Sequence, residues 1–180
     1  MERSLTHIAL FAALIAVLGL VPPMTLPFGV PITAQSLGIM LCGTVLGAKR
    51  GALAVLLFLA LVAAGLPLLS GGRGGLGVFA GPSVGYLIGF PVAAFVAGFV
   101  VERTSLPVGY AAACGAVLGG IGALYAFGIP GMAIMLDKSL TEAAHIGMAF
   151  LPGDVVKVVL AALVTRGIAQ ARPGALLSRA

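Results

Sequence analysis

Long apolar stretches, separated by short turn segments, are the feature that most constrains this chain. Six of them stand out, at residues 5–20, 32–46, 51–66, 84–101, 108–127 and 150–168. A helix needs about 20 apolar residues to cross a hydrocarbon core of about 30 Å. Only 8% of the residues are charged, against about 25% in a soluble domain. The sequence therefore predicts an all-α integral membrane protein with six transmembrane helices.

The length of the chain favours one domain. Its 180 residues are about the size of one typical domain, so we treat residues 1–180 as a single six-helix membrane domain. Arg3 ahead of the first apolar run resembles the start of a signal peptide, but no clear A-x-A cleavage site follows. We expect the first helix to be retained.

The basic residues are divided unevenly between the two sides of the predicted helices. Seven of the ten lie on one side: Arg3, Lys49, Arg50, Arg103, Arg166, Arg172 and Arg179. Only Arg73 and Lys138 lie on the other, and Lys157 falls within the last span. Because Lys and Arg near helix ends stay on the cytoplasmic side, both termini are predicted to be cytoplasmic. The longer connections 21–31, 67–81 and 128–149 are then outside, where loops can close over a ligand.

Composition and motifs exclude several classes of function. The basic residues are scattered and form no basic helix face, so nucleic-acid binding is not expected. Cys42 and Cys114 lie inside apolar runs, far from residues at metal-ligand spacing, so no metal site is expected. The chain has no Walker A lysine, so any use of ATP must belong to another protein.

Asp154 and Lys157 stand one helical turn apart in LPGDVVKVVLAALV and project from the same helix face. An ionisable residue in the hydrocarbon costs about 2.5–3.5 kcal/mol even on insertion scales. The pair can position the helix as an ion pair, or the lysine can extend outward to the interface. Alternatively the pair forms a polar binding site in the outer half of the membrane, suited to a zwitterionic or amide-like ligand.

Three further polar residues are predicted on the outer side. Gln35 lies near the outer start of the second span, at a depth comparable to Asp154, and its alternative is an ordinary interfacial residue. Arg73 lies among glycines in SGGRGGLGVFAGP, which either lays its backbone close to a ligand or is a disordered loop. Tyr86 heads the fourth span, as an interface anchor or a ligand contact.

Residues 81–85, GPSVG, satisfy the G-x-S-x-G pattern of serine hydrolases. That nucleophile elbow requires a strand before the serine, and nothing before Gly81 resembles a buried strand. His7 is expected across the membrane from Ser83, and His145 has no triad spacing to an acid. A membrane serine hydrolase using Ser83 is therefore an alternative that we do not favour.

Four alanines form a narrow stripe on the first helix: Ala9, Ala12, Ala13 and Ala16. Small residues at this spacing let helices approach closely within a membrane. The stripe either packs against another helix of the same chain or contacts a partner subunit.

Taken together, these residues resemble the biotin-specific substrate-binding subunits of energy-coupling-factor (ECF) transporters, the BioY family. The resemblance runs over residues 9–163 and is carried by VPITAQSL, LGAKRGAL, GGRGGLGVFAGPSVGYLIGFP and LPGDVVKVVLAAL, in that order. The family's loop more usually reads G-P-T-G-G-Y, so Ser83 and Val84 depart from it. Serine keeps the hydroxyl of threonine, whereas valine for glycine changes how closely the backbone can approach a ligand.

The resemblance implies a multi-pass S component in a bacterial cell membrane, which is not an enzyme and has no cofactor of its own. It would capture biotin from outside and work with a transmembrane coupling subunit (T component) and cytoplasmic ABC ATPases that use ATP. Carried over, Asp154, Lys157 and Tyr86 bind the ligand, with Arg73, Gln35, Ser83 and Gly85 placed at the same site. The alanine stripe matches the family's A-x-x-x-A contact with the coupling subunit. The alternatives are an S component for another vitamin and a purely structural scaffold.

Overall fold

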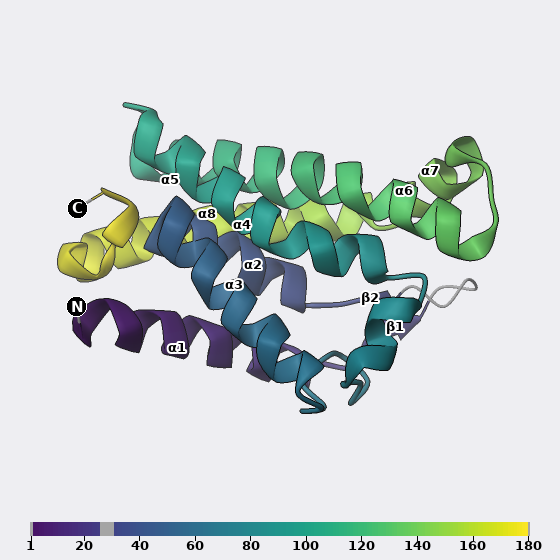
Figure 1. The fold of residues 1–180 in the computed structure, drawn as a ribbon. Coiled ribbons are helices and arrows are strands. Elements are labelled where there is room, and N and C mark those ends of the chain that lie inside the picture. Colours follow the sequence, from purple (N-terminus) through teal and green to yellow (C-terminus); the bar gives the residue numbers. More distant parts are fainter. Residues whose placement is uncertain (1, 26–30, 180) are drawn as a thin grey trace.

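The computed structural model describes residues 2–25 and 31–179 and shows a bundle of helices with both termini at one end (Figure 1). The longer helices are α1 (Glu2–Leu18), α2 (Gln35–Leu46), α3 (Ala48–Ala63), α4 (Val84–Arg103), α5 (Val108–Gly115), α6 (Leu124–Leu136), α7 (Leu140–Met148) and α8 (Leu151–Ala171). The described strands are β1 (Met24–Thr25) and β2 (Pro31–Ile32), which pair antiparallel. The all-α prediction is confirmed.

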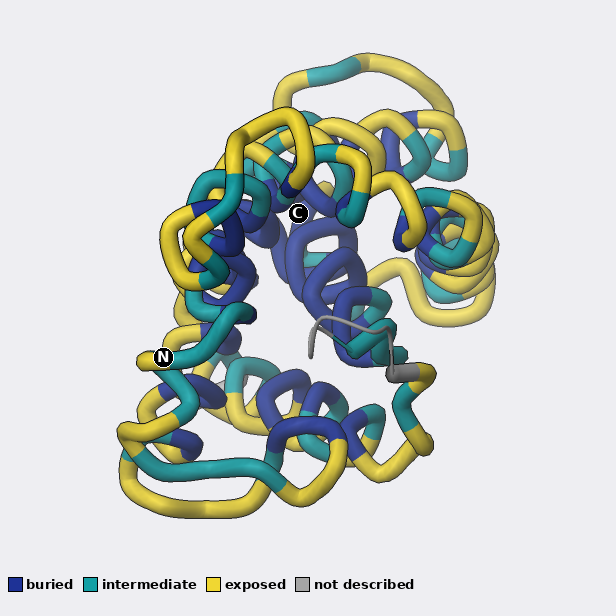
Figure 2. Tube along the Cα trace, turned by 90° about the vertical axis from the view of Figure 1, so that its right-hand side faces the viewer, coloured by how far each residue is buried: buried dark blue, intermediate teal, exposed yellow. Residues whose placement is uncertain are grey.

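Helix α2 is the centre of the bundle. Eleven of its twelve residues are buried, and it contacts α1, α3, α4 and α8. Figure 2 shows buried residues turned toward the interior and exposed ones on the outer faces. A helix that is apolar on all sides is expected where neighbours surround it, and QSLGIMLCGTVL has this character.

Glycines allow helices to pack closely against α4. A Cβ atom at Gly43 of α2 would collide with the carbonyl oxygen of Ala94, and one at Gly119 with that of Ala93. Within a bilayer the hydrophobic effect does not favour helix association, so dispersion contacts between closely packed small residues hold the helices together. The close contacts place α2 and α4, which both line the cavity described below.

The segment that follows α5 corrects one prediction. Residues 128–149 were expected to form an outer connection, but α5 continues through a π-helical segment, Ala116–Ala123, into α6. Helix α6 ends at Leu136, because Asp137 adopts a left-handed conformation, and α7 follows. Gly-x-Pro-Gly at 128–131 resembles a turn, yet Pro130 lies inside α6. Membrane helices tolerate proline where neighbours satisfy the backbone, so the fifth stretch extends beyond its predicted end at 127.

Several helices have the length and composition of membrane spans. Val84–Arg103 and the continuous helix Val108–Leu136 qualify alone, and α7 with α8 forms a pair bent by 54° that qualifies together. Ser4–Leu18 and Gln35–Leu46 are shorter and apolar. Large apolar side chains such as Ile88, Phe99 and Leu160 are exposed on the outer faces. These features are those of a membrane protein.

Candidate functional site

A cavity lies between α2, α4, α6 and α8, beside β2 and the loop that connects α3 to α4. Its polar lining residues are Ser36, Arg73, Ser83, Tyr86, Asp154 and Lys157, together with Thr33 and Gln35. The space left free by protein atoms is about 590 Å³, a value that includes the open solvent at the mouth of the cavity. Figure 1 shows β2 and the start of α4 at the end of the bundle away from the termini. The cavity thus opens toward that end.

Asp154 and Lys157 form a buried ion pair in the cavity wall. Lys157 Nζ lies 2.9 Å from Asp154 Oδ1, and the two side chains are only 13% and 6% exposed, respectively. Lys157 also donates to Ser36 Oγ at 2.8 Å, and the Tyr125 hydroxyl donates to Asp154 Oδ2 at 2.7 Å. In the structure Lys157 is turned toward Asp154 and Ser36 rather than extended to the interface. A buried charge is costly unless an opposite charge and hydrogen bonds compensate it, and both residues of this pair have such partners.

The pair keeps unused hydrogen-bonding capacity. An ammonium group has three donors, of which Asp154 and Ser36 take two. Each carboxylate oxygen of Asp154 has two lone pairs. Oδ1 accepts from Lys157 and, at 3.5 Å, from the Ser36 hydroxyl, whereas Oδ2 accepts only from Tyr125, so Oδ2 can accept one further donor. The site can therefore donate to an acceptor and accept from a donor at adjacent points, as an amide-like ligand needs.

Tyr86 contributes a buried hydroxyl that is not satisfied by the protein. The residue is 9% exposed, and its oxygen has no hydrogen-bond partner among the described residues. Its ring packs edge-on against Tyr125 and Phe150, with centroids 6.3 and 5.8 Å away. A buried polar group left unpaired costs about 1–3 kcal/mol. Because Tyr86 lines the cavity, a polar ligand atom is the natural partner.

Gln35 lines the cavity, but the protein itself uses its side-chain amide. Nε2 donates to the carbonyl oxygens of Ile15 at 3.2 Å and Leu68 at 3.0 Å, and Oε1 accepts from the Ser70 N–H at 3.0 Å. The side chain therefore connects the end of α1, the start of α2 and the loop that carries Arg73. Both of its donors are engaged, so the structure supports a role in positioning that loop.

We expect Gln35→Leu to lower the melting temperature of the purified protein in detergent. The substitution leaves buried backbone groups of Leu68 and Ser70 without partners, at about 1–3 kcal/mol for such a group. Thermal unfolding followed by circular dichroism measures the change. Gln170→Leu is the matched control, because Gln170 is exposed near the end of α8. An equal melting temperature in both variants would show that the Gln35 hydrogen bonds contribute little.

Arg73 supplies a cation to the cavity lining. It pairs through its backbone with Leu69, and its Nε donates to the Ser70 carbonyl oxygen at 3.3 Å. No ion-pair partner of Arg73 occurs in the part of the chain that the structure describes. Gly71 and Gly72 have φ angles of 80° and 68°, which favour glycine and fold the loop back toward α2. An anionic ligand group can meet this guanidinium.

Ser83 and Gly85 have different environments. Ser83 is buried in the cavity lining just before α4, and its hydroxyl makes no helix-capping hydrogen bond with any described residue. Gly85 instead faces α6, where a Cβ atom would collide with the Phe127 carbonyl oxygen and lie 2.9 Å from the Gly131 Cα. The structure thus brings Ser83 to the cavity and gives Gly85 a place in helix packing.

Two polar residues of the site were missed in the sequence. Tyr125 donates to Asp154, and Ser36 accepts from Lys157. Ser36 follows Gln35 directly, so its place beside the predicted polar start of the second span was a usable signal. For Tyr125 the only signal in the sequence was a side chain with a polar hydroxyl inside an apolar run.

The four alanines of α1 form two pairs. Ala12 is 3% exposed and Ala16 is half-buried, so they pack against the bundle, whereas Ala9 and Ala13 are exposed. Ala12 and Ala16 therefore pack against helices of the same chain, and contact with a partner subunit stays a prediction for Ala9 and Ala13. Ala9 and Ala13, one turn apart, leave a shallow outer surface on α1.

Comparison with known proteins places the chain in a family. The sequence model of the BioY family matches residues 2–174. The chain belongs to the BioY family. A BioY protein of Rhodobacter capsulatus named as a biotin transporter is 58% identical over 189 residues, covering 99% of this chain and all of that protein. One of Rhizobium etli with the same name is 52% identical and covers 92% of each chain.

The BioY fold also matches a solved structure. A crystal structure at 2.1 Å of the S component for biotin from an ECF-type ABC transporter superposes with a TM-score of 0.88. The match has 32% sequence identity and covers 94% of this chain and 92% of the other. The helices of this chain are therefore arranged as in that S component.

Proposed function

We propose that this protein is the biotin-binding S component of an ECF-type transporter and that the cavity is its biotin site. The observation that carries the proposal is the Asp154–Lys157 pair, which lines one cavity together with Tyr86, whose hydroxyl has no partner among the described residues. The names of the BioY relatives and of the matching crystal structure support biotin as the ligand.

The chemistry of biotin fits these residues. Its ureido ring has two N–H donors, one of which Asp154 Oδ2 can accept from, and one carbonyl, which can accept from the remaining Lys157 donor. Its valerate carboxylate is the natural partner of Arg73 or of backbone N–H groups in the glycine loop. Apolar walls at Leu87 and Phe90 suit the thiophane ring. Gln35 then acts on the ligand indirectly, by holding the loop.

The proposed topology has six crossings: α1, α2, α3, α4, the continuous α5–α6 helix, and α8. An even number of crossings brings the two termini to one side, and Figure 1 places them at the same end of the bundle. The excess of basic residues on that side makes it cytoplasmic. The cavity then opens outward, as capture of an external vitamin requires, and the protein is a multi-pass protein of the bacterial cell membrane.

Transport would require partner subunits. The sequence has no Walker A lysine, and the matching crystal structure is that of a component of a larger transporter. We infer that ABC ATPases supply the energy and that a transmembrane coupling subunit contacts α1 at Ala9 and Ala13. The protein itself is then a binding subunit and not an enzyme.

The cavity brings no histidine to Ser83. Ser83 lines it, but within the described ranges neither His7 nor His145 does. His145 is exposed on α7 and contacts the carbonyl oxygen of Thr141 through Nδ1. Lys157, which also lines the cavity, is paired with Asp154, so the geometry favours Ser83 as a neighbour of the ligand over a histidine-activated nucleophile.

A vitamin panel tests the proposal directly. We expect biotin to raise the melting temperature of the purified protein, because ligand at 100 times its Kd stabilises the folded state by about 2.7 kcal/mol. Riboflavin and thiamine should leave it unchanged. Thermal shift and native mass spectrometry give independent measurements. Saturable binding of riboflavin or thiamine without binding of biotin would overturn the substrate, and no response to any vitamin would favour a scaffold.

Ser83→Ala is the control variant for the hydrolase alternative. A binding subunit should retain much of its biotin affinity without this hydroxyl. Ester or peptide hydrolysis by the wild type that disappears in Ser83→Ala would contradict the proposed function.

A further inference from the structure

A second concave surface lies between α5 and α8, and its lining on α8 begins at Val158, directly after Lys157 of the biotin cavity. Its floor and walls are apolar: Val108, Ala113, Val158, Val159, Ala162 and Leu163. The groove has a volume of about 650 Å³. Val159 and Leu163 are exposed in the chain alone, so the groove faces outward from the bundle.

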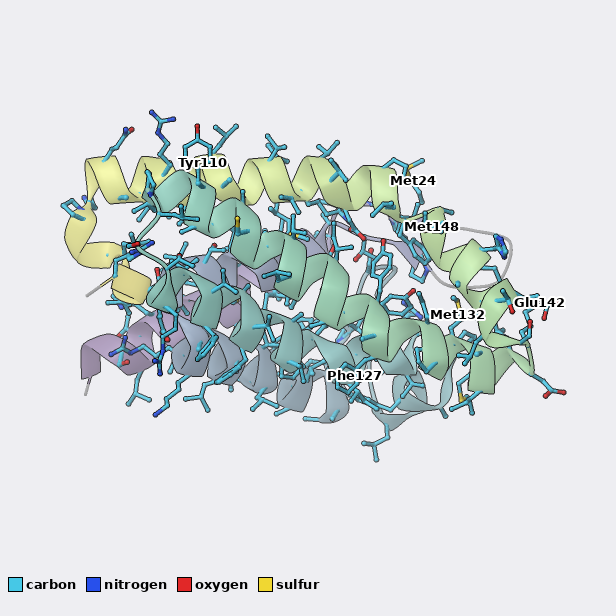
Figure 3. The ribbon with its side chains drawn as sticks, turned by 90° about the horizontal axis from the view of Figure 1, so that it is seen from above. Met24, Tyr110, Phe127, Met132, Glu142 and Met148 are labelled. Atoms are coloured by element: carbon cyan, nitrogen blue, oxygen red, sulfur yellow. The ribbon has the colours of Figure 1, made fainter. Side chains whose placement is uncertain are left out.

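The groove changes character at the end near the termini, where Tyr110, Arg166 and Gln170 line it. Figure 3 shows Tyr110 beside α8, at the end of the molecule opposite Glu142 and Met148. The side chain of Arg166 lies across Gly109, because a Cβ atom there would be only 3.4 Å from the Arg166 Cδ. Arg166 therefore lies beside Gly109 at the end of the groove near the termini.

Positive charge gathers at this end without acidic partners. Arg179 donates through Nη2 to the carbonyl oxygen of Leu106 at 2.9 Å, next to Pro107 in the groove wall. Among the described residues, neither Arg166 nor Arg179 has an ion-pair partner, and the groove lining includes no Asp or Glu. An apolar groove that ends at unpaired arginines is complementary to a molecule with an apolar chain and an anionic head.

We propose that this groove binds an anionic phospholipid of the cytoplasmic leaflet. One acyl chain lies along Val158, Ala162 and Leu163, and the phosphate meets the Arg166 guanidinium, with Tyr110 at the level of the head groups. Basic pockets between helices on the cytoplasmic side bind anionic lipid heads in this way, and Arg matches phosphate oxygens in a bidentate geometry. The placement rests on the membrane orientation proposed above.

Charge argues against a second copy of the chain as the occupant. In a two-fold symmetric dimer the same surface of each copy meets its equivalent. A dimer across this groove would bring two Arg166 side chains to the same depth, without an acid in either lining. Like charges in that position repel, whereas a phospholipid head group neutralises them.

The test uses the full-length protein in nanodiscs of equimolar dioleoyl phosphatidylglycerol and dioleoyl phosphatidylcholine, released for native mass spectrometry. We expect retained phosphatidylglycerol to exceed phosphatidylcholine at least fivefold, and Arg166→Gln to abolish most of that excess. Arg103→Gln is the matched control: Arg103 ends α4 at the same side, stacked over Phe99 at 5.2 Å, and does not line the groove. It should keep the excess.

Ala162→Trp tests the apolar part, because its ring would fill the groove and should reduce retention of both lipids at least threefold. Equal retention of the two lipids by the wild type would overturn the proposal. Unchanged lipid retention in both Arg166→Gln and Ala162→Trp would also overturn it. A wild-type dimer that becomes monomeric in Ala162→Trp would do the same, because a second copy would then occupy the groove. The biotin thermal shift is recorded for every variant. A groove variant that loses lipid but keeps this shift supports the proposal independently of the biotin site.

Discussion

Asp154→Asn is expected to weaken biotin binding at least tenfold, which corresponds to about 1.4 kcal/mol. The carboxylate accepts from Lys157, Ser36 and Tyr125 and has one lone pair left, on Oδ2, for a ureido N–H group. Asparagine keeps the shape but replaces one oxygen by a donor and removes the charge. The lysine then remains buried with a weaker partner, and the ligand loses an acceptor. Isothermal titration of the purified protein with biotin measures the loss.

Lys157→Ala should weaken binding to a similar extent, because it removes the donor for the ureido carbonyl and leaves the Asp154 charge unpaired. Circular dichroism separates this from unfolding: the variants should keep their helical content, although breaking a buried pair also lowers stability. Asp137→Asn is the control, since Asp137 is an exposed carboxylate at the end of α6. Unchanged affinity in both Asp154→Asn and Lys157→Ala would remove the pair from the site.

The Asp154–Lys157 pair could be predicted from the sequence because its two residues are only three positions apart. Two opposite charges three residues apart in an apolar helix must meet or find partners, and spacing alone places them on one face. Gln35 was also visible, but its role was not. Its hydrogen bonds reach Leu68 and Ser70, residues so distant in the sequence that no local pattern indicates them.

Tyr125 shows a different limit of sequence reasoning. It follows the π-helical segment Ala116–Ala123, where the chain takes more residues per turn than in an α-helix. A count at 3.6 residues per turn from the start of α5 therefore gives the wrong face for every residue after the segment. Only the three-dimensional structure shows that the Tyr125 hydroxyl points to Asp154.

The apolar stretches predicted helices well, but the turn signals did not always mark their ends. Glycine and proline at 128–131 suggested a loop, whereas Gly128 and Gly131 bring α6 close to Tyr86 and Gly85 of α4. In a membrane the same residues that break soluble helices serve helix contacts. A glycine near a proline was therefore ambiguous until the neighbouring helix was known.

Ala13→Trp is expected to reduce recovery of the coupling subunit with this protein, and biotin uptake by cells, at least tenfold. Ala13 and Ala9 are exposed on α1, where small side chains let another helix approach closely. An indole ring would hold the two backbones apart and remove the dispersion contacts between them. Biotin affinity of the isolated subunit should stay within twofold, because α1 contributes no residue to the lining of the cavity.

The control variant must carry its tryptophan on an exposed surface away from α1. Ala12→Trp would be uninformative, because Ala12 is buried and a large ring there would disrupt the bundle. Leu118→Trp places the same indole ring on an exposed residue of the α5–α6 helix, a helix on the side of the bundle opposite α1 (Figure 1), and should leave assembly and uptake intact. An intact complex with unimpaired uptake in Ala13→Trp would place the coupling surface elsewhere. Loss of uptake in both variants would instead indicate a general defect in insertion, since the two helices share no surface.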